Sequence, residues 1–168
     1  MAEEGNGGFL GVLRMDVDRL GAVFSIGIPK ERQNISRIAS LSSDMELFFT
    51  GYFQNLCKKE FEKNTYVAYS GGDDLFVIGA WDMVLDLACK VREDFKAFTC
   101  QNEDLNISGG LFLCKGKYPI HRAAERAEHL LNDLAKKNEA DKDTLKRARH
   151  QISTWKNDMV AAETPLTH

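Results

Sequence analysis

Thr65-Tyr-Val-Ala-Tyr-Ser-Gly-Gly-Asp-Asp-Leu-Phe-Val-Ile-Gly-Ala80 is the stretch that decides the fold. Its apolar and β-branched residues predict two short strands, at 66–69 and 75–78, both expected to be buried. Gly71 and Gly72 stand between the strands, and glycine adopts a positive φ without steric cost. The stretch therefore predicts a tight β-hairpin.

Two acids, Asp73 and Asp74, follow the glycines at the point where turn and strand meet. Adjacent like charges in a buried hairpin raise its electrostatic energy, and a bound divalent cation would remove that cost. The alternative is a solvated Asp-rich turn, since Gly and Asp are common turn residues. The hairpin alone favours neither interpretation.

Size and composition indicate an ordinary soluble domain. The chain has 168 residues, enough for one domain with a real core. The net charge of −3 gives no sign of a strongly basic nucleic-acid surface, although a small, locally basic pocket is compatible with that total.

Cysteine usage and the N-terminus indicate the compartment. None of Cys57, Cys89, Cys100 and Cys114 forms a Cys-x-x-Cys pair, which argues against a zinc site or a redox motif. Free thiols suit a reducing cytoplasm. The first residues are acidic and Gly-rich, unlike a signal peptide, and no apolar run approaches the ~20 residues of a membrane span. We therefore expect a cytoplasmic protein without a membrane partner.

A second pair of acids ends the first predicted strand, residues 9–17. Asp16 and Asp18 are two residues apart and point to the same face if the strand continues through them. Carboxylates at the end of a strand are common in functional sites. The alternative is a strand exit with a polar cap.

The remaining pattern predicts the topology. Apolar residues three or four apart predict helices at 34–62 and 81–98, and Pro119 suits the first position of another helix. Residues 19–32 read as a connection, 105–114 as a strand and 151–155 as a short edge strand. The glycines at 109–110 imply a bulge or a close approach to the strand's backbone.

This order predicts an α+β fold of ferredoxin-like type, with helices packed on a central antiparallel sheet. We expect a single domain over 9–155, a flexible leader at 1–8 and a flexible tail at 156–168. In such a sheet the first strand lies beside the hairpin. Asp16 and Asp18 would then lie beside Asp73 and Asp74, which favours the metal interpretation.

Carboxylates at 16, 73 and 74 make a hard oxygen site suited to Mg²⁺ or Mn²⁺. Such metals can clamp both the attacking hydroxyl and the leaving pyrophosphate of a nucleoside triphosphate, so we predict nucleotidyl transfer. The loop after Asp18, Arg19-Leu20-Gly21, could offer backbone N–H groups to the phosphates, so Asp18, Arg19 and Leu20 are candidate substrate-binding residues. Lys136 could reach phosphate oxygens; alternatively it is an ordinary cation at a helix end.

Several motifs also resemble a known family. Residues 69–76, Tyr-Ser-Gly-Gly-Asp-Asp-Leu-Phe, resemble the Gly-Gly-Asp-Asp signature of the polymerase/cyclase palm in the large subunit of type III CRISPR effector complexes, especially the Csm type. The resemblance extends over roughly residues 9–137, in segments that keep the family's order: 13–21, 35–39, 79–82, 107–110, 117–120 and 135–136. More distantly, the chain resembles diguanylate cyclases.

The resemblance implies conversion of ATP to cyclic oligoadenylate, a second messenger in antiviral defence. It implies that Asp16, the Val17 carbonyl, Asp73 and Asp74 bind the metals. It places Gly71 and Gly72 against the nucleotide and Lys136 on the triphosphate. Ser70 and Ser108 lie near the site in such folds, with Ser70 expected to help bind substrate.

The chain departs from the family in length, because the family subunit is several times longer. Joining two nucleotides needs two facing sites, so we expect a homodimer or a second palm domain, with guide RNA and other effector subunits as further partners. A stand-alone minimal CRISPR polymerase is also compatible. Alternative functions are a cyclic dinucleotide synthase using GTP or mixed substrates, and a nucleotide-binding scaffold without turnover.

Overall fold

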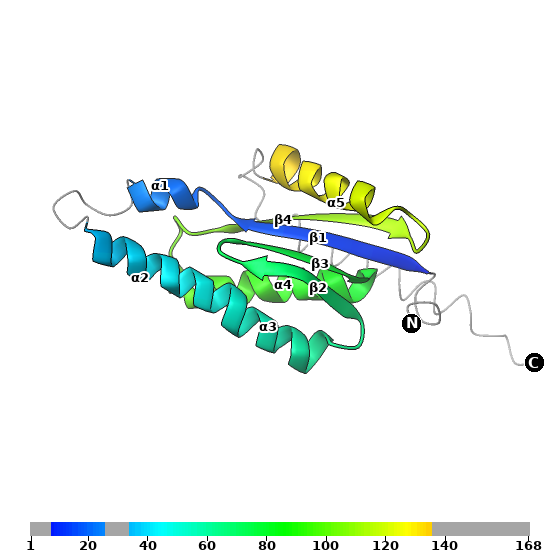
Figure 1. The fold of residues 1–168 in the computed structure, drawn as a ribbon, viewed down its shortest axis with the longest axis horizontal. Coiled ribbons are helices and arrows are strands. Elements are labelled where there is room, and N and C mark those ends of the chain that lie inside the picture. The colour runs from blue at the N-terminus through cyan, green and yellow to red at the C-terminus, as the bar shows by residue number, and fades with distance from the viewer. Residues whose placement is uncertain (1–7, 26–33, 136–168) are drawn as a thin grey trace, which may run out of the picture. The chain divides into compact units, whose positions relative to one another are not determined.

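The computed structural model describes residues 8–25 and 34–135, which form one antiparallel sheet with helices on both faces (Figure 1). The strand order is β2-β3-β1-β4. The strands are β1 (Phe9–Val17), β2 (Thr65–Gly71), β3 (Asp74–Ala80) and β4 (Ile107–Lys115). The predicted α+β fold is confirmed, with the first strand beside the hairpin.

One long helical segment lies between β1 and β2 and begins at Ile35. It comprises α2 (Ile35–Glu46), a wider π-helical stretch (Leu47–Tyr52), α3 (Phe53–Leu56) and a second π-helical stretch (Cys57–Phe61). The Asn34 side chain caps α2 by accepting a 2.9 Å hydrogen bond from the Arg37 N–H. The helix predicted from apolar spacing is therefore present, and Asn34 is its N-cap.

This segment and α4 (Trp81–Phe98) cover one face of the sheet. Buried side chains of both helices pack on those of β1, β3 and β4 that point to the same face. The largest are aromatic: Phe48 packs edge-on against Phe49 and Phe95, with ring centroids 5.3 and 5.2 Å apart. The phenylalanines of the long helical segment at 48, 49 and 53 are therefore core residues.

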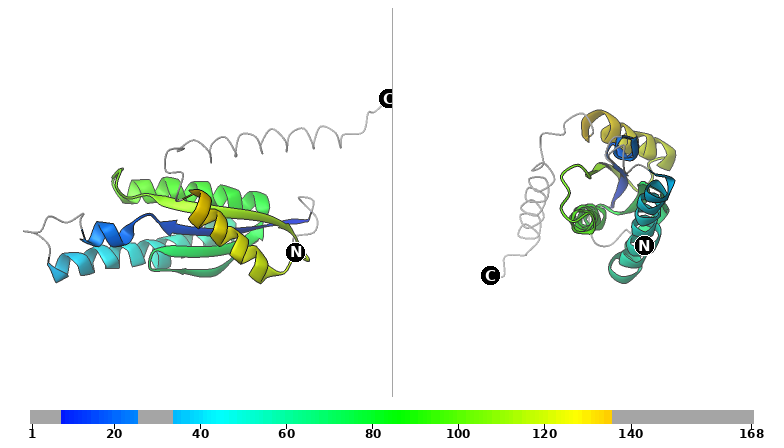
Figure 2. Two further views of the ribbon diagram at one scale, coloured as in Figure 1. Left: turned by 90° about the horizontal axis from the view of Figure 1, so that it is seen from above. Right: turned by 90° about the vertical axis from the view of Figure 1, so that its left-hand side faces the viewer.

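The opposite face carries α5 (Ile120–His129), which continues as a π-helical stretch (Leu130–Ala135). The views in Figures 1 and 2 show α5 across the sheet from α2, α3 and α4. Ala123 and Ala127 are fully buried against Val12 and Cys114. A Cβ on Gly110 would collide with the Ala127 carbonyl and the Leu131 backbone. Of the two explanations for the paired glycines in this strand, close backbone approach is the correct one.

Two expectations about the hairpin and the first loop are wrong in detail. Strand β2 is an edge strand with a register shift between Val67 and Tyr69, and half or more of Tyr66 and Tyr69 is exposed. Its aromatic residues are therefore not core residues. The connection after β1 holds a short helix, α1 (Leu20–Ser25), because the Arg19 carbonyl accepts hydrogen bonds from the Ala22 and Val23 N–H groups.

Other predictions lie outside the described residues: the leader at 1–8 apart from Gly8, the edge strand at 151–155, the tail at 156–168, and Lys136. In the part of the chain that the structure describes, no helix is both long and apolar enough to span a membrane.

Candidate functional site

Asp16 and Asp74 stand directly opposite each other in the β1–β3 ladder. Both side chains belong to the α5 face, because the alternating residues of the same strands, Met15 and Leu75, are buried in the core of the other face. Opposed residues in an antiparallel pair have Cβ atoms roughly 5 Å apart. The sheet therefore brings together two of the carboxylates that the sequence predicts to act together.

The hairpin turn places the third carboxylate. Gly71 pairs with Asp74, so Gly72 and Asp73 are the two central turn residues. Gly72 has φ +66° while Asp73 does not have a positive φ, the pattern of a type II′ turn with glycine first. A Cβ on Gly72 would meet nothing within 4 Å, so open space lies over the turn. The Val17 N–H donates to the Asp73 carbonyl at 3.0 Å, which ties the turn to the end of β1.

The electrostatics of Asp74 reflect this crowding. Partial burial raises the pKa of Asp74, and the neighbouring Asp73 and Asp16 carboxylates raise it further. The Arg14 guanidinium and a hydrogen bond with Tyr69 act in the opposite direction without cancelling the rise. A cation bound at this place would favour the ionised form of Asp74 and so act against the rise in its pKa.

Arg14 is a site residue that sequence reasoning missed. Its Nη2 lies 3.9 Å from Asp74 Oδ2, its Nη1 donates to Glu128 Oε2 at 2.8 Å, and its guanidinium lies 5.7 Å from the Phe76 ring centroid. The available signal was a lone cation inside an apolar strand, two residues before Asp16 and hence on its face.

Asp18 is held by the strand on the other side of β1. Its N–H donates to the Asn106 carbonyl at 2.8 Å, and Ser108 Oγ donates to its Oδ2 at 2.8 Å. Ser108 is also the partner of Asp16 in the β1–β4 ladder. Although β1 ends at Val17, Ser108 thus links the two acids of this strand end, as the ladder partner of Asp16 and the hydrogen-bond donor to Asp18.

The predicted phosphate-binding loop has a special backbone. Arg19 adopts φ +54°, a left-handed conformation that is uncommon for a residue other than glycine. Leu20 is the first residue of α1, and its side chain packs against the core on the face of the sheet that α2 and α4 cover. The structure therefore places Arg19 and Leu20 directly beyond the acidic end of β1.

The Ser70 hydroxyl points away from the carboxylates. It donates to the Phe49 carbonyl at 2.5 Å, and Ser70 pairs with Leu75, whose side chain is in the core of the α2–α4 face. A contact of Ser70 with a nucleotide would have to come from its backbone. The hydroxyl instead fastens the hairpin to the long helix.

The carboxylate oxygens of the site are ligands of the kind that Mg²⁺ and Mn²⁺ prefer. Within residues 8–25 and 34–135, no three Asp, Glu, His or Cys side chains are placed so that they could hold a metal ion by themselves. Mg²⁺ is usually held by one or two carboxylates together with substrate phosphates, and an opposed pair with raised electrostatic energy meets that need. Asp16 and Asp74, with Asp73 beside them, fit a metal that arrives with its nucleotide.

Comparison with known proteins identifies the family. A family model described as "Cas10/Cmr2, second palm domain" matches residues 9–146. The chain belongs to the Cas10/Cmr2 second palm domain family. The resemblance seen in the sequence motifs is thereby confirmed, and the α+β sheet is a palm.

Curated relatives of this palm domain belong to CRISPR systems. The chain is 40% identical over 134 residues to the CRISPR system single-strand-specific deoxyribonuclease Cas10/Csm1 (subtype III-A) of Methanocaldococcus jannaschii, covering 74% of this chain and 17% of the relative. It is 39% identical over 151 residues to the protein of that name from Enterococcus italicus, covering 90% of this chain and 18% of the relative. The palm domain thus spans less than a fifth of these relatives, whose deoxyribonuclease name describes the longer proteins.

Solved structures share the fold. A Csm1–Csm4 cassette in complex with AMPPNP matches with a TM-score of 0.69 and 34% identity over 79% of this chain and 20% of that chain. The cassette in complex with cA4 matches with a TM-score of 0.67 and 33% identity over the same shares.

Proposed function

We propose that this palm domain is a metal-dependent nucleotidyltransferase that converts ATP to a cyclic oligoadenylate in CRISPR-type antiviral defence. The observation that carries the proposal is the Asp16–Asp74 pair, opposed across β1 and β3, with Asp73 in the adjoining turn. A site without chemistry would not need to hold like charges against each other at the end of a sheet.

The chain's own residues have separable roles in this proposal. Asp16, Asp73, Asp74 and the Val17 carbonyl would hold Mg²⁺ or Mn²⁺. When bound, such ions stabilise the charge that develops on the attacking and leaving oxygens of an in-line displacement. Arg14 partly offsets the charge on Asp74 before ligands arrive.

Substrate positioning falls to the loops beside the acids. Gly72, with open space above it, lets a nucleotide approach the hairpin backbone, and Gly71 precedes it in the turn. Backbone N–H groups after Asp18, at Arg19 and Leu20, would contact the triphosphate, as would Lys136. Ser108 fixes Asp18 and so sets where that loop begins.

Joining two nucleotides requires a second site opposite this one. A homodimer, or a second palm domain in a longer protein, would present the attacking hydroxyl across from Asp73. Two of the similar solved structures are named as Csm1–Csm4 complexes with AMPPNP and with cA4. These names support ATP as substrate, a cyclic oligoadenylate as product and another effector subunit as partner.

The deciding experiment is a product assay on the purified chain with ATP and Mg²⁺ or Mn²⁺, read by mass spectrometry over a range of protein concentrations. We expect an oligoadenylate product whose yield per protomer rises with concentration, because two sites must meet. Asp73→Ala combined with Asp74→Ala should abolish turnover while the circular dichroism spectrum is kept. Product from GTP alone would favour the cyclic dinucleotide alternative. Nucleotide binding without any product at high protein concentration would favour the scaffold alternative and contradict the proposal.

A further inference from the structure

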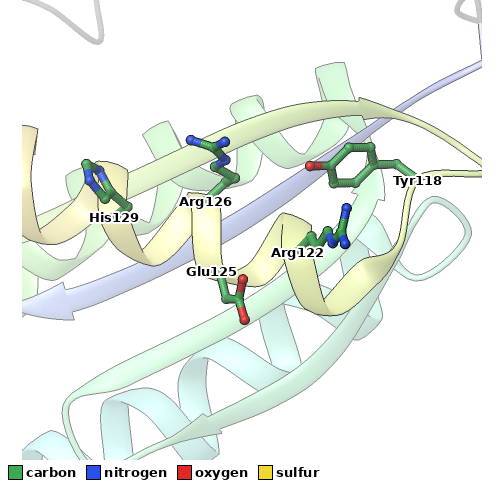
Figure 3. Close-up of a pocket in the computed structure, with 5 residues that line it drawn as sticks. All are labelled: Tyr118, Arg122, Glu125, Arg126 and His129. Atoms are coloured by element: carbon green, nitrogen blue, oxygen red, sulfur yellow. The ribbon is translucent and has the colours of Figure 1, made fainter.

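A cationic hollow lies beside the edge strand β4, on the outer side of α5 (Figure 3). Two adjoining cavities of about 420 and 280 Å³ share Tyr118, Arg126 and His129 in their walls. Arg122 and Glu125 also line the first cavity, and Phe112 and Leu130 the second. None of these residues belongs to the carboxylate site, so the hollow is a separate feature of the domain.

The charge of this surface differs from that of the chain. The whole chain carries 22 Lys and Arg against 25 Asp and Glu. Residues 115–129 contain four Lys and Arg residues but only two acids, Glu125 and Glu128. Glu128 is paired with Arg14. Glu125 lines the first cavity, but Figure 3 shows its carboxylate pointing away from Arg126 and His129, so the two arginines outnumber it in the wall. The hollow is therefore a locally basic pocket within an acidic protein.

The two arginine side chains of the hollow are spaced so that they could contact two successive phosphate groups. Arg122 and Arg126 are four residues apart, so their guanidinium groups lie on one helix face, separated by about one turn or 6 Å along the axis. Both side chains are exposed, and neither forms an ion pair with a residue in the described part of the chain. Guanidinium groups match phosphate oxygens through paired N–H donors.

An aromatic ring stands at the same place. Tyr118 packs against Phe112 with ring centroids 5.7 Å apart, which fixes the ring beside the arginines. A positive groove together with an aromatic surface is the arrangement that binds single-stranded nucleic acid, through phosphate contacts and base stacking. An acidic peptide would use the arginines but not the ring.

We propose that the α5–β4 hollow binds the phosphodiester backbone of a single-stranded nucleic acid, with Arg122 and Arg126 on successive phosphates and Tyr118 against a base. The site is distinct from the carboxylate site, so the proposal does not depend on the proposed function. RNA and DNA share the recognised chemistry, and the experiment separates them.

The test is fluorescence anisotropy of a labelled 12-nucleotide single-stranded RNA, and of the DNA of the same sequence, in EDTA so that no metal-dependent nucleotide binding contributes. The variant is Arg122→Ala with Arg126→Ala. The matched control is Lys58→Ala with Lys59→Ala, which removes the same charge from an exposed stretch on the other side of the sheet. Circular dichroism establishes that each variant is folded.

We expect the arginine variant to bind about tenfold more weakly and its salt slope to decrease by about 1.4, because each phosphate contact in a single strand contributes about 0.7. The lysine control should bind each oligonucleotide as tightly as the unaltered chain does. Whichever of the RNA and the DNA is bound with the higher affinity is the preferred ligand. An equal loss of affinity in the arginine and lysine variants would show that binding depends only on net charge, which would overturn the proposal. Absence of binding to either oligonucleotide, or arginine-dependent binding of polyglutamate in their place, would overturn it as well.

Discussion

Asp16 on β1 and Asp74 on β3 are cross-strand partners. Their two carboxylates therefore stand opposite each other at the end of the sheet where the hairpin turns. Like charges directly opposite each other in an antiparallel pair are destabilising. The stability of the domain, its response to pH and its response to ligands should all reflect this pair.

The first prediction concerns stability without ligands. Asp74→Asn should raise the free energy of unfolding at pH 7 in EDTA by on the order of 0.5 kcal/mol, because it removes one of the opposed charges. The pKa of Asp74 is raised in the folded state, so the folded chain binds the proton more tightly than the unfolded chain. The penalty in the unaltered chain therefore grows as pH rises through the unfolded value of about 3.9, and it is absent below that value.

Urea denaturation at pH 7 and near pH 3 measures both parts of this prediction. The exposed Asp44→Asn in α2 serves as the control and should change stability little at either pH. An Asp74→Asn advantage that persists unchanged at the lower pH would show that its origin is not the carboxylate charge.

The second prediction concerns metal and nucleotide together. Since no three described acids or other ligating side chains can hold a metal by themselves, Mg²⁺ alone should stabilise the chain little. Mg²⁺ with a non-hydrolysable ATP analogue at ten times Kd should stabilise it by about 1.4 kcal/mol, or about 3–6 °C in Tm. Asp16→Asn and Asp74→Asn should each remove most of this shift in thermal denaturation, and Asp44→Asn should keep it. A full shift with the analogue in EDTA would contradict the metal assignment.

Sequence reasoning succeeded where the signal was local. Apolar spacing gave the long helix and α4, the Gly-Gly-Asp-Asp turn gave the hairpin, and the order of elements placed β1 beside it. The exposure of β2 was missed because Tyr66 and Tyr69 are equally suited to a core strand and an open edge. Edge position is set by which strands pair, and that information is not local.

The role of Arg14 and the direction of the Ser70 hydroxyl were missed for the same reason, because both depend on contacts between elements far apart in the sequence. The contacts of Arg14 with Asp74 and Glu128 join three elements, and nothing near Arg14 in sequence announces them. The direction of the Ser70 hydroxyl depends on the register shift in β2, which changes how the strand's side chains alternate after Val67. Register and bulges follow from packing between elements.

The third prediction concerns Ser108. Ser108→Ala should weaken nucleotide affinity and lower stability by about 1–2 kcal/mol, because Asp18 loses a 2.8 Å charge-assisted hydrogen bond in a partly buried place. Ser108→Thr keeps a hydroxyl and should retain most of both properties. Calorimetric titration with the Mg²⁺–analogue complex and urea denaturation measure the two effects. If the alanine variant matches the unaltered chain in both, then Ser108 does not position Asp18.

The fourth prediction concerns thiol reactivity. Cys100 is exposed, whereas Cys57 is buried and its burial raises the pKa of its thiol to about 11. The thiolate is the reactive form, so in the folded chain at pH 8 iodoacetamide should label Cys100 first and Cys57 only slowly. Peptide mass spectrometry over time resolves the order, and labelling in urea gives the unprotected rates. Equal rates for the two thiols in the folded chain would place Cys57 at the surface and contradict the packing of the long helix.

The last prediction concerns Gly110, where α5 comes closest to the sheet. A Cβ at this position would collide with backbone atoms of Ala127 and Leu131, which cannot rotate away as a side chain can. Gly110→Ala should therefore lower the free energy of unfolding by about 1–3 kcal/mol, the usual cost of overpacking. The control is Gly21→Ala in α1, where a Cβ meets nothing within 4 Å and helix propensity favours alanine by about 1 kcal/mol. Urea denaturation compares the two variants.

Because α5 also carries Glu128, the partner of Arg14, a displaced helix should weaken binding of the nucleotide analogue as well. A Gly110→Ala variant with unaltered stability would mean that α5 does not pack against the backbone of β4.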